Sequence, residues 1–284
     1  MGLGGFFNYE KPGPGISKDA PKKKMFFAFL EVWFRNFWKL MLVSLVYSVM
    51  GLFLIPCGLA EAGMANVCRN LARDRHSFGI SDFFATIKKN WKQALPIGLI
   101  NLVVTALLGF ALYFYSVNGG IISVLAFGIC FVCLTVFTFM KYHIWLIVIT
   151  FKLPAKNIYK NCFLFAFVNL KYNILIAVIS IALTAGLTAL FFTYYPILWV
   201  LSIIIMIAVM PGFINLFIQF CIFPKVKTLM IDPYYAEHKG EDVNLRRGLG
   251  LDIEEEDDEN VFDDMGKTEE TKKQEYKKTR PTVF

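Results

Sequence analysis

Long apolar stretches without a charged residue alternate with short basic segments along the chain, and they predict membrane-spanning helices. Three such stretches occur, at Leu40–Ala60, Gln93–Met140 and Tyr172–Pro224. A transmembrane helix needs about 20 predominantly apolar residues. The second stretch, of 48 residues, therefore accommodates two spans, and the third, of 53 residues, accommodates two more. We expect the turns of these two hairpins at Asn118–Gly120 and Tyr194–Tyr195, on the outer side of the membrane.

The first stretch, Leu40–Ala60, decides whether the chain crosses the membrane five or six times. A single crossing would place the basic residues between Arg69 and Lys92 opposite the basic N-terminal segment, against the positive-inside bias. The conflict disappears if the chain turns at Pro56–Gly58 and Leu59–Leu71 returns as a second helix. Small residues on that segment permit close helix packing: Ala60, Ala62, Gly63 and Ala65. We therefore predict an all-α, polytopic transmembrane bundle with six spans, with five as the alternative, and with both termini in the cytoplasm.

Amphipathic segments occupy the expected cytoplasmic side of these spans. Met25–Lys39 mixes aromatic residues with charges every four positions, and Lys152–Lys171 begins basic and becomes aromatic. In Ser81–Gln93, Ser81 is a candidate helix cap, and aromatic and basic residues follow at helical spacing. These residues form a candidate docking surface: Phe83, Phe84, Lys88, Lys89, Trp91 and Lys92. We expect all three segments to form interfacial helices.

Composition and charge agree with a protein that contacts the lipid bilayer. Hydrophobic residues make up 56% of the chain and charged residues 18%, whereas soluble domains average about 45–50% and about 25%. The formal net charge is +7. Because the basic residues flank the apolar runs, membrane topology explains them, and no nucleic-acid partner is expected.

The charge changes sign along the chain and divides it into three regions. Residues 1–24 are rich in Gly and Pro and are expected to be an irregular cytoplasmic segment, and residues 25–224 form the membrane domain. Residues 225–284 hold 11 basic and 16 acidic side chains. We expect them to form a cytoplasmic tail that is acidic and largely disordered from about residue 251, because its like charges repel and it has little apolar surface to bury.

No sequence pattern indicates catalysis. The chain has no phosphate-binding loop, no metalloprotease motif and no serine-hydrolase motif, and its three histidines lie far apart. Cys130 and Cys133 have the spacing of a thiol pair, but inside an uncharged span cysteine commonly acts as a small apolar residue. We therefore expect no catalytic residue, no cofactor and no metal site, and we expect that the protein is not an enzyme.

Three polar residues within the predicted spans are candidates for function: Glu61, Asn101 and Gln219. An intramembrane carboxylate such as Glu61 can belong to a proton or cation path, or it can cap the returning helix at the outer interface. Asn101 and Gln219 can line a polar path or hold helices together. Lys141 and His143 stand beside aromatic residues and are interpreted as interfacial anchors.

Several segments carry a family resemblance. FRNFWKL at 34–40, IPCGLAEAGMANVCRNLARD at 55–74 and SDFFATIKKNWKQA at 81–94, with FPKVKTLMIDPYY at 223–235, resemble the YesL-like family of bacterial membrane proteins. The resemblance covers roughly residues 6–236. It implies a domain of unknown function with an accessory role in sugar uptake, and it defines no active-site residue.

These observations lead to a functional hypothesis with alternatives. We expect a non-enzymatic protein of the bacterial cytoplasmic membrane, accessory to a carbohydrate ABC-type importer, with Ser81–Gln93 and Ala155–Asn169 as docking surfaces. The chain lacks the E-A-A-x-x-x-G loop by which importer permeases contact their ATPase, so the permease itself is not expected. The alternatives are a stand-alone secondary transporter or channel, and a membrane sensor or assembly factor.

Overall fold

The computed structural model describes residues 25–53, 56–193 and 195–233, and every regular element within those residues is helical. The elements in chain order are α1 (Met25–Arg35), α2 (Phe37–Gly51), α3 (Cys57–Ala72), α4 (Ile80–Val117), α5 (Ile121–Thr150), α6 (Ala155–Val168), α7 (Leu170–Ala189), η2 (Leu190–Phe192), α8 (Pro196–Ile204), η3 (Ile205–Val209), α9 (Met210–Val226) and η4 (Lys227–Ile231). The predicted irregular N-terminal segment, residues 1–24, and the tail from residue 234 onward lie outside the described residues. The predicted boundary at residue 225 is wrong, because α9 and η4 continue the last long helix to Ile231.

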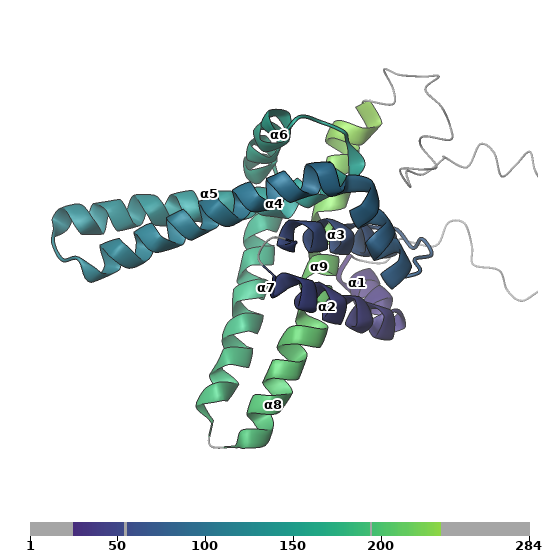
Figure 1. The fold of residues 1–284 in the computed structure, drawn as a ribbon, viewed down its shortest axis with the longest axis horizontal. Coiled ribbons are helices and arrows are strands. Elements are labelled where there is room, and N and C mark those ends of the chain that lie inside the picture. Colours follow the sequence, from purple (N-terminus) through teal and green to yellow (C-terminus); the bar gives the residue numbers. More distant parts are fainter. Residues whose placement is uncertain (1–24, 54–55, 194, 234–284) are drawn as a thin grey trace, which may run out of the picture.

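Two long helical hairpins dominate the molecule and leave a common core in different directions (Figure 1). One is α4–α5, and the other joins α7–η2 to the continuous helix from α8 to η4. Four helical stretches in the described part of the chain are long and apolar enough to cross a membrane: Ile80–Val117, Ile121–Thr150, Leu170–Phe192 and Pro196–Ile231. Both predicted hairpins are therefore present as pairs of apolar helices.

The predicted turn of the first long hairpin is confirmed. α4 ends before Asn118, whose side chain donates a hydrogen bond to the Phe114 carbonyl at 2.7 Å. Gly120 follows with a φ of +108°, a backbone conformation that glycine adopts without steric cost. In the second hairpin the chain turns between Thr193 and Pro196, and Tyr194 lies outside the described residues.

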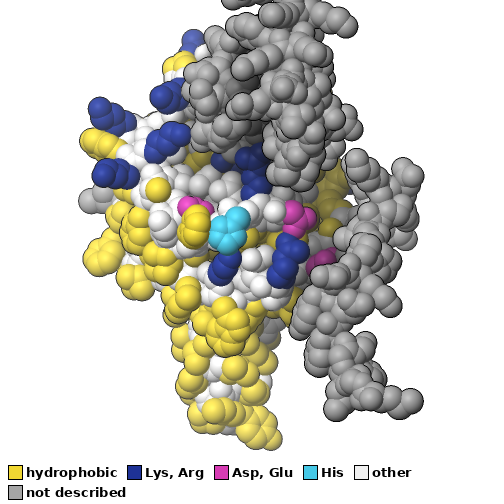
Figure 2. All heavy atoms as spheres, turned by 90° about the vertical axis from the view of Figure 1, so that its right-hand side faces the viewer, with side chains coloured by type: hydrophobic (Ala, Val, Ile, Leu, Met, Phe, Trp, Pro, Cys, Tyr) yellow, Lys and Arg dark blue, Asp and Glu magenta, His cyan; other side chains and the backbone are white. Residues whose placement is uncertain are grey.

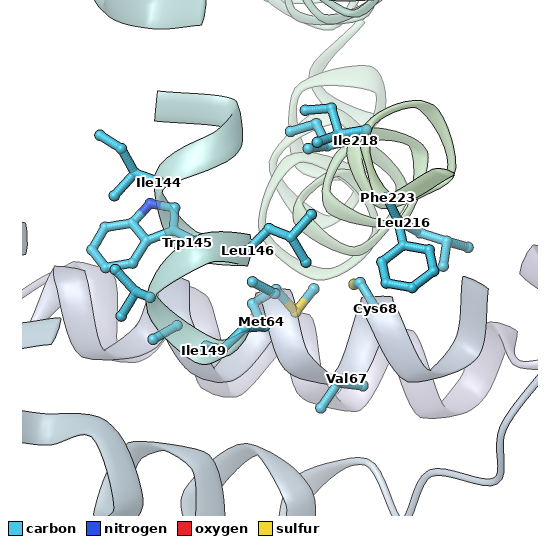
Figure 3. Packing of buried hydrophobic residues seen from close by; sticks show 14 of the residues in the cluster. Met64, Val67, Cys68, Ile144, Trp145, Leu146, Ile149, Leu216, Ile218 and Phe223 are labelled. Atoms are coloured by element: carbon cyan, nitrogen blue, oxygen red, sulfur yellow. The ribbon is translucent and has the colours of Figure 1, made fainter. Parts of the chain in front are cut away.

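The core lies where the two hairpins meet, and α3 is at its centre. α3 packs against α4, α5 and α9, and Figure 3 shows Met64 and Cys68 of α3 facing side chains of α5 and α9. The inner end of α5 is almost completely buried from His143 to Thr150. α1 covers the same core with Phe29, whose ring makes edge-on contacts with Phe213, Phe217 and Phe220 of α9.

The first hairpin, α2–α3, turns where the sequence predicts, because α3 begins directly after Pro56. The four small residues predicted to permit close packing are all buried: Ala60, Ala62, Gly63 and Ala65. α3 runs antiparallel to the first half of α4, with Gly58 beside Gly98 and the Asn66 amide donating to Thr86 Oγ1 at 2.7 Å. The turn between α2 and α3 therefore lies beside the middle of α4.

This hairpin is much shorter than the other two. With 15 and 16 residues, α2 and α3 are about 22 and 24 Å long at 1.5 Å per residue, whereas the hydrocarbon core of a bilayer is about 30 Å thick. The described residues thus contain the predicted fold-back of the chain, together with four helices that are long enough to span a membrane.

Ser81–Gln93 is not a separate helix, which corrects the sequence prediction. It forms the first turns of α4, and the helix continues through Pro96 to Val117. Ser81 is not the cap either. The Asp82 carboxylate accepts hydrogen bonds from Ser77 Oγ at 2.8 Å and from the Phe78 backbone N–H at 3.0 Å, and so closes the turn before the helix. The predicted amphipathic helix around Ala155–Asn169 is present as α6.

A proline in the last long helix is accommodated by a side chain from α2. Pro211 has no N–H to donate to the carbonyl four residues earlier, and the helix widens into the π-helical segment η3 just before it. The freed carbonyl is that of Ile207, and it accepts a hydrogen bond from Ser48 Oγ at 2.8 Å. Close packing of α2 on α9 continues at Gly212, where an added Cβ would lie 2.6 Å from Ser44 Oγ.

Candidate functional site

A cavity of about 320 Å³ lies between α2, α3, α5 and the η3–α9 segment, where the short hairpin meets the two long ones. Its polar wall consists of Tyr47, Glu61, Thr138, Lys141, Tyr142, Asn215 and Gln219. Its apolar wall includes Trp145, Met206, Met210 and Ile214. We call this the Glu61 cavity. Its size is at the lower end of the range for small-molecule sites.

Glu61 lies in the second turn of α3 and accepts a hydrogen bond from the Tyr47 hydroxyl of α2 at 2.9 Å. The fold-back of the chain at Pro56 brings these two residues together, although they are 14 positions apart. The α3 N-terminus has no side-chain cap, so the interpretation of Glu61 as a cap of this helix is wrong. The carboxylate instead faces a cavity between helices.

Lys141 of α5 brings the opposite charge to the same cavity. Its ammonium group interacts electrostatically with Glu61, but among the described residues it makes no ion pair within 4.0 Å and no hydrogen bond. Lys141 thus lies in the wall of the cavity, and its role as an interfacial anchor stays a prediction. The sequence signal was available, because Lys141 is the single charged residue between Lys92 and Lys152.

A second cavity, of about 200 Å³, lies on the other side of these two residues between α3, α4 and α5. Glu61, Lys141 and Trp145 line both cavities. Asn101 of α4 lines the second one and accepts a hydrogen bond from the Tyr159 hydroxyl of α6 at 2.8 Å. Burial raises the pKa of Tyr159 to about 12, so this phenol remains a donor at neutral pH.

Two buried amides have an unused hydrogen-bonding atom at these cavities. Asn101 is 4% exposed, and its Nδ2 has no hydrogen-bond partner in the described part of the chain. Gln219 is 2% exposed, and its Oε1 likewise has no hydrogen-bond partner there. The structure places Asn101 and Gln219 on opposite sides of Glu61, in different cavities. An unsatisfied buried polar group costs about 1–3 kcal/mol, so such atoms indicate a site for water or a ligand.

His143 is not an interfacial anchor. It is completely buried, its Nδ1 donates to the Phe139 carbonyl at 3.0 Å, and its ring stacks on Phe165 at a centroid distance of 5.6 Å. Arg69, which the sequence did not single out, is also buried and donates to Thr150 Oγ1 at 3.0 Å and to Asn66 at 2.8 Å. These two residues join helices within the core and do not line either cavity.

The candidate docking surface is divided by the fold. Phe83 is completely buried, with its ring against Gly63 of α3, so it belongs to the core and not to the surface. The remaining five residues are exposed: Phe84, Lys88, Lys89, Trp91 and Lys92. The Lys92 ammonium lies 5.8 Å from the centre of the Trp91 ring. In Figure 2 the Lys and Arg side chains gather at the core end, whereas the downward-pointing hairpin displays hydrophobic side chains.

Neither the cysteines nor the acidic and histidine side chains assemble a metal site in the described residues, where no group of three such ligands comes together. Cys130 and Cys133 are free thiols on the outer part of α5.

Comparison with known proteins gives one match. The model of a family described as a protein of unknown function, DUF624, matches residues 40–114, which include nearly all of α2, α3 and α4. No curated protein and no solved structure shows a significant match to the chain. The matched region contains Tyr47, Glu61 and Asn101, together with the five exposed residues of the docking surface.

Proposed function

We propose that the protein is a non-enzymatic, multi-pass protein of the bacterial cytoplasmic membrane that assists a carbohydrate ABC-type importer. The resemblance of its sequence to the YesL-like family supports this proposal. The four long apolar helices support the membrane location.

The docking role is supported by an exposed aromatic and basic face at the start of α4. We call it the α4 surface, and it consists of Phe84, Lys88, Lys89, Trp91 and Lys92. Phe84 and Trp91 are about half exposed, at 49% and 50%, and they lie seven positions apart, so both project from one side of the helix. Aromatic residues contribute strongly to protein interfaces. Lys156 and Lys160 of α6 are also exposed, so this second candidate docking segment is basic as well.

We further propose that both termini are cytoplasmic and that the tips of the two long hairpins face outward. In this arrangement the α4 surface is cytoplasmic, as docking to an importer ATPase or its permease loops requires. α2–α3 then enters the membrane and returns to the cytoplasmic side. Its short helices favour a return hairpin over two complete spans, and non-spanning segments of this kind are tolerated where protein surrounds them.

Charge reversal on the α4 surface tests the docking role. The triple variant K88E/K89E/K92E should remain in the membrane but lose co-purification with the importer, and growth on the cognate oligosaccharide should fall. The matched control is K171E/K225E, which reverses two exposed charges on α7 and α9, outside both candidate docking segments. If this control has as large an effect, general basic charge and not the α4 surface is responsible.

Two other outcomes would refute the proposal. Misinsertion of the triple variant would show that these lysines serve topology. Unchanged insertion, co-purification and growth would show that the α4 surface does not dock.

A stand-alone secondary transporter is the second candidate, and the Glu61 cavity favours it. Intramembrane carboxylates and proline-interrupted helices occur at transporter binding sites, and here Glu61 and Pro211 line one cavity. Proteoliposomes that contain the purified protein alone distinguish the candidates. A transporter gives substrate-dependent flux, whereas an accessory protein gives none.

A further inference from the structure

We propose that the Glu61 cavity binds a small, uncharged, polyhydroxylated molecule of the size of a mono- or disaccharide. This inference rests on the proposed function in carbohydrate uptake for its biological setting. The argument for the ligand's chemistry comes from the charges, the hydrogen-bonding groups and the walls of the cavity.

The charges of the cavity favour an uncharged ligand. Glu61 and Lys141 line it from α3 and α5, so its formal charge is balanced. An anion would be repelled by the Glu61 carboxylate, and a cation would be repelled by the Lys141 ammonium, so neither is favoured over an uncharged molecule. Because the two side chains do not form an ion pair with each other, both remain available for hydrogen bonds to a third group between them.

The hydrogen-bonding groups match hydroxyls, which both donate and accept. The Tyr47 hydroxyl donates to Glu61, and its oxygen can still accept. Lys141 donates, and Gln219, whose buried Oε1 has no partner among the described residues, lies in the cavity wall and can turn this acceptor toward a ligand. Several donors and acceptors around one space suit a chain of hydroxyl groups better than a single ion.

The remaining walls suit the apolar faces of a sugar ring. Trp145 and Tyr142 of α5 supply aromatic surfaces, and Met206 and Met210 supply flexible apolar ones. A pyranose ring presents C–H groups on its faces and hydroxyls at its rim, so it can contact both kinds of wall at once. The volume of about 320 Å³ limits the ligand to a small molecule of this kind.

Ligand titration of the full chain in phospholipid nanodiscs tests the proposal. Nanodiscs are required because maltoside detergents themselves carry a sugar headgroup. Glucose and maltose are the neutral probes, glycine betaine is the zwitterionic probe and sodium chloride is the ionic one. We expect saturable binding of at least one saccharide by calorimetry, with a matching rise in melting temperature.

Two cavity variants and one control locate the binding. Gln219→Leu removes the unpartnered acceptor and should weaken binding about ten-fold or more, and Met206→Trp should block binding by filling the cavity. The matched control is Asn118→Leu, which removes an amide at the outer turn and should leave the affinity unchanged. If Gln219→Leu does not fold, the loss or retention of saccharide binding in Met206→Trp alone shows whether the ligand binds in this cavity.

Three results would overturn the proposal: no saturable saccharide binding, binding that survives both cavity variants, or binding of glycine betaine or sodium ions in place of saccharides. Failure of the proposed docking function is separable from these results. If the docking function is wrong, the K88E/K89E/K92E variant still co-purifies with the importer. That result does not depend on saccharide binding by the cavity variants.

Discussion

Gly58 and Gly98 allow the backbones of α3 and α4 to touch. A Cβ added at Gly98 would lie 2.5 Å from the Gly58 Cα and 3.0 Å from the Gly58 backbone nitrogen. Both atoms belong to the backbone, so no side-chain rotation can relieve the contact. The position of Glu61, one turn after Gly58, depends on this close approach.

We predict that Gly98→Leu destabilises the protein. Added side-chain volume at a tightly packed contact typically costs about 1–3 kcal/mol, and here the helices must separate to admit it. Thermal unfolding in nanodiscs should therefore show a lower melting temperature. Gly109→Leu is the matched control, because Gly109 lies on the same helix with open space around it. Equal melting temperatures for the two variants would contradict the close contact.

We predict an interaction between Ser48 and Pro211 across α2 and α9. Ser48→Ala leaves the Ile207 carbonyl without its hydrogen bond from Ser48 Oγ and should cost about 0.5–1.5 kcal/mol. In a Pro211→Ala background the restored backbone N–H can bond to this carbonyl, so the same Ser48→Ala change should cost less. A double-mutant cycle measures this difference. Additive effects would show that the serine does not compensate for the proline.

At the scale of elements, the sequence predicted those features that depend on local composition. Charge-free stretches identified both long hairpins, and the basic residues on both sides of Leu40–Ala60 indicated the fold-back at Pro56 into α3. The continuity of α4 was missed because its sequence changes from an amphipathic to a uniformly apolar pattern near Gln93, although the helix does not end there. Helix continuity is set by backbone hydrogen bonds, and a change in hydrophobic pattern does not break them.

The site was harder to predict than the hairpins. Glu61 and Lys141 are 80 positions apart, and only the packing of α3 against α5 brings them to one cavity. Glu61, Asn101 and Gln219 were each identifiable as polar residues in apolar surroundings. Tyr47 was missed because a tyrosine in an apolar helix is ordinary, and its role appears only once the hydrogen bond to Glu61 is known.

The three hairpins give a prediction about topology. Single cysteines at Asn118, Lys88 and Leu52 in a cysteine-free background are treated with a membrane-impermeant maleimide on intact cells. Asn118 at the outer turn should react, and Lys88 should react only after permeabilisation. Leu52, at the end of α2 and 80% exposed, should stay unreactive on intact cells if α2–α3 is a return hairpin whose tip lies within the membrane. Reaction of Leu52 on intact cells would favour six complete spans, and reaction of Lys88 would contradict the proposed orientation.

At the scale of the whole molecule, the two hairpins and the core end have different surfaces. The outer parts of the hairpins expose large apolar side chains such as Phe110, Phe131 and Ile181, whereas the core end exposes Lys88, Lys89 and Lys92. Because the hairpins leave the core in different directions (Figure 1), one bilayer can contain both only if each is tilted from its normal, as transmembrane helices commonly are.

We predict that the hairpins contact lipid acyl chains and that the core end does not. A photoreactive phenylalanine analogue at Phe110 or Phe131 should crosslink to acyl chains, since both rings point away from protein contacts and are 67% and 56% exposed. Phe78 is the matched control, because it is 72% exposed but lies between His76 and the start of α4, beside the basic residues. Mass spectrometry of the crosslinked lipid distinguishes the positions. Acyl-chain crosslinking at Phe78 equal to that at Phe110 would mean that the core end is also within the hydrocarbon, and the α4 surface would then be unavailable to a cytoplasmic partner.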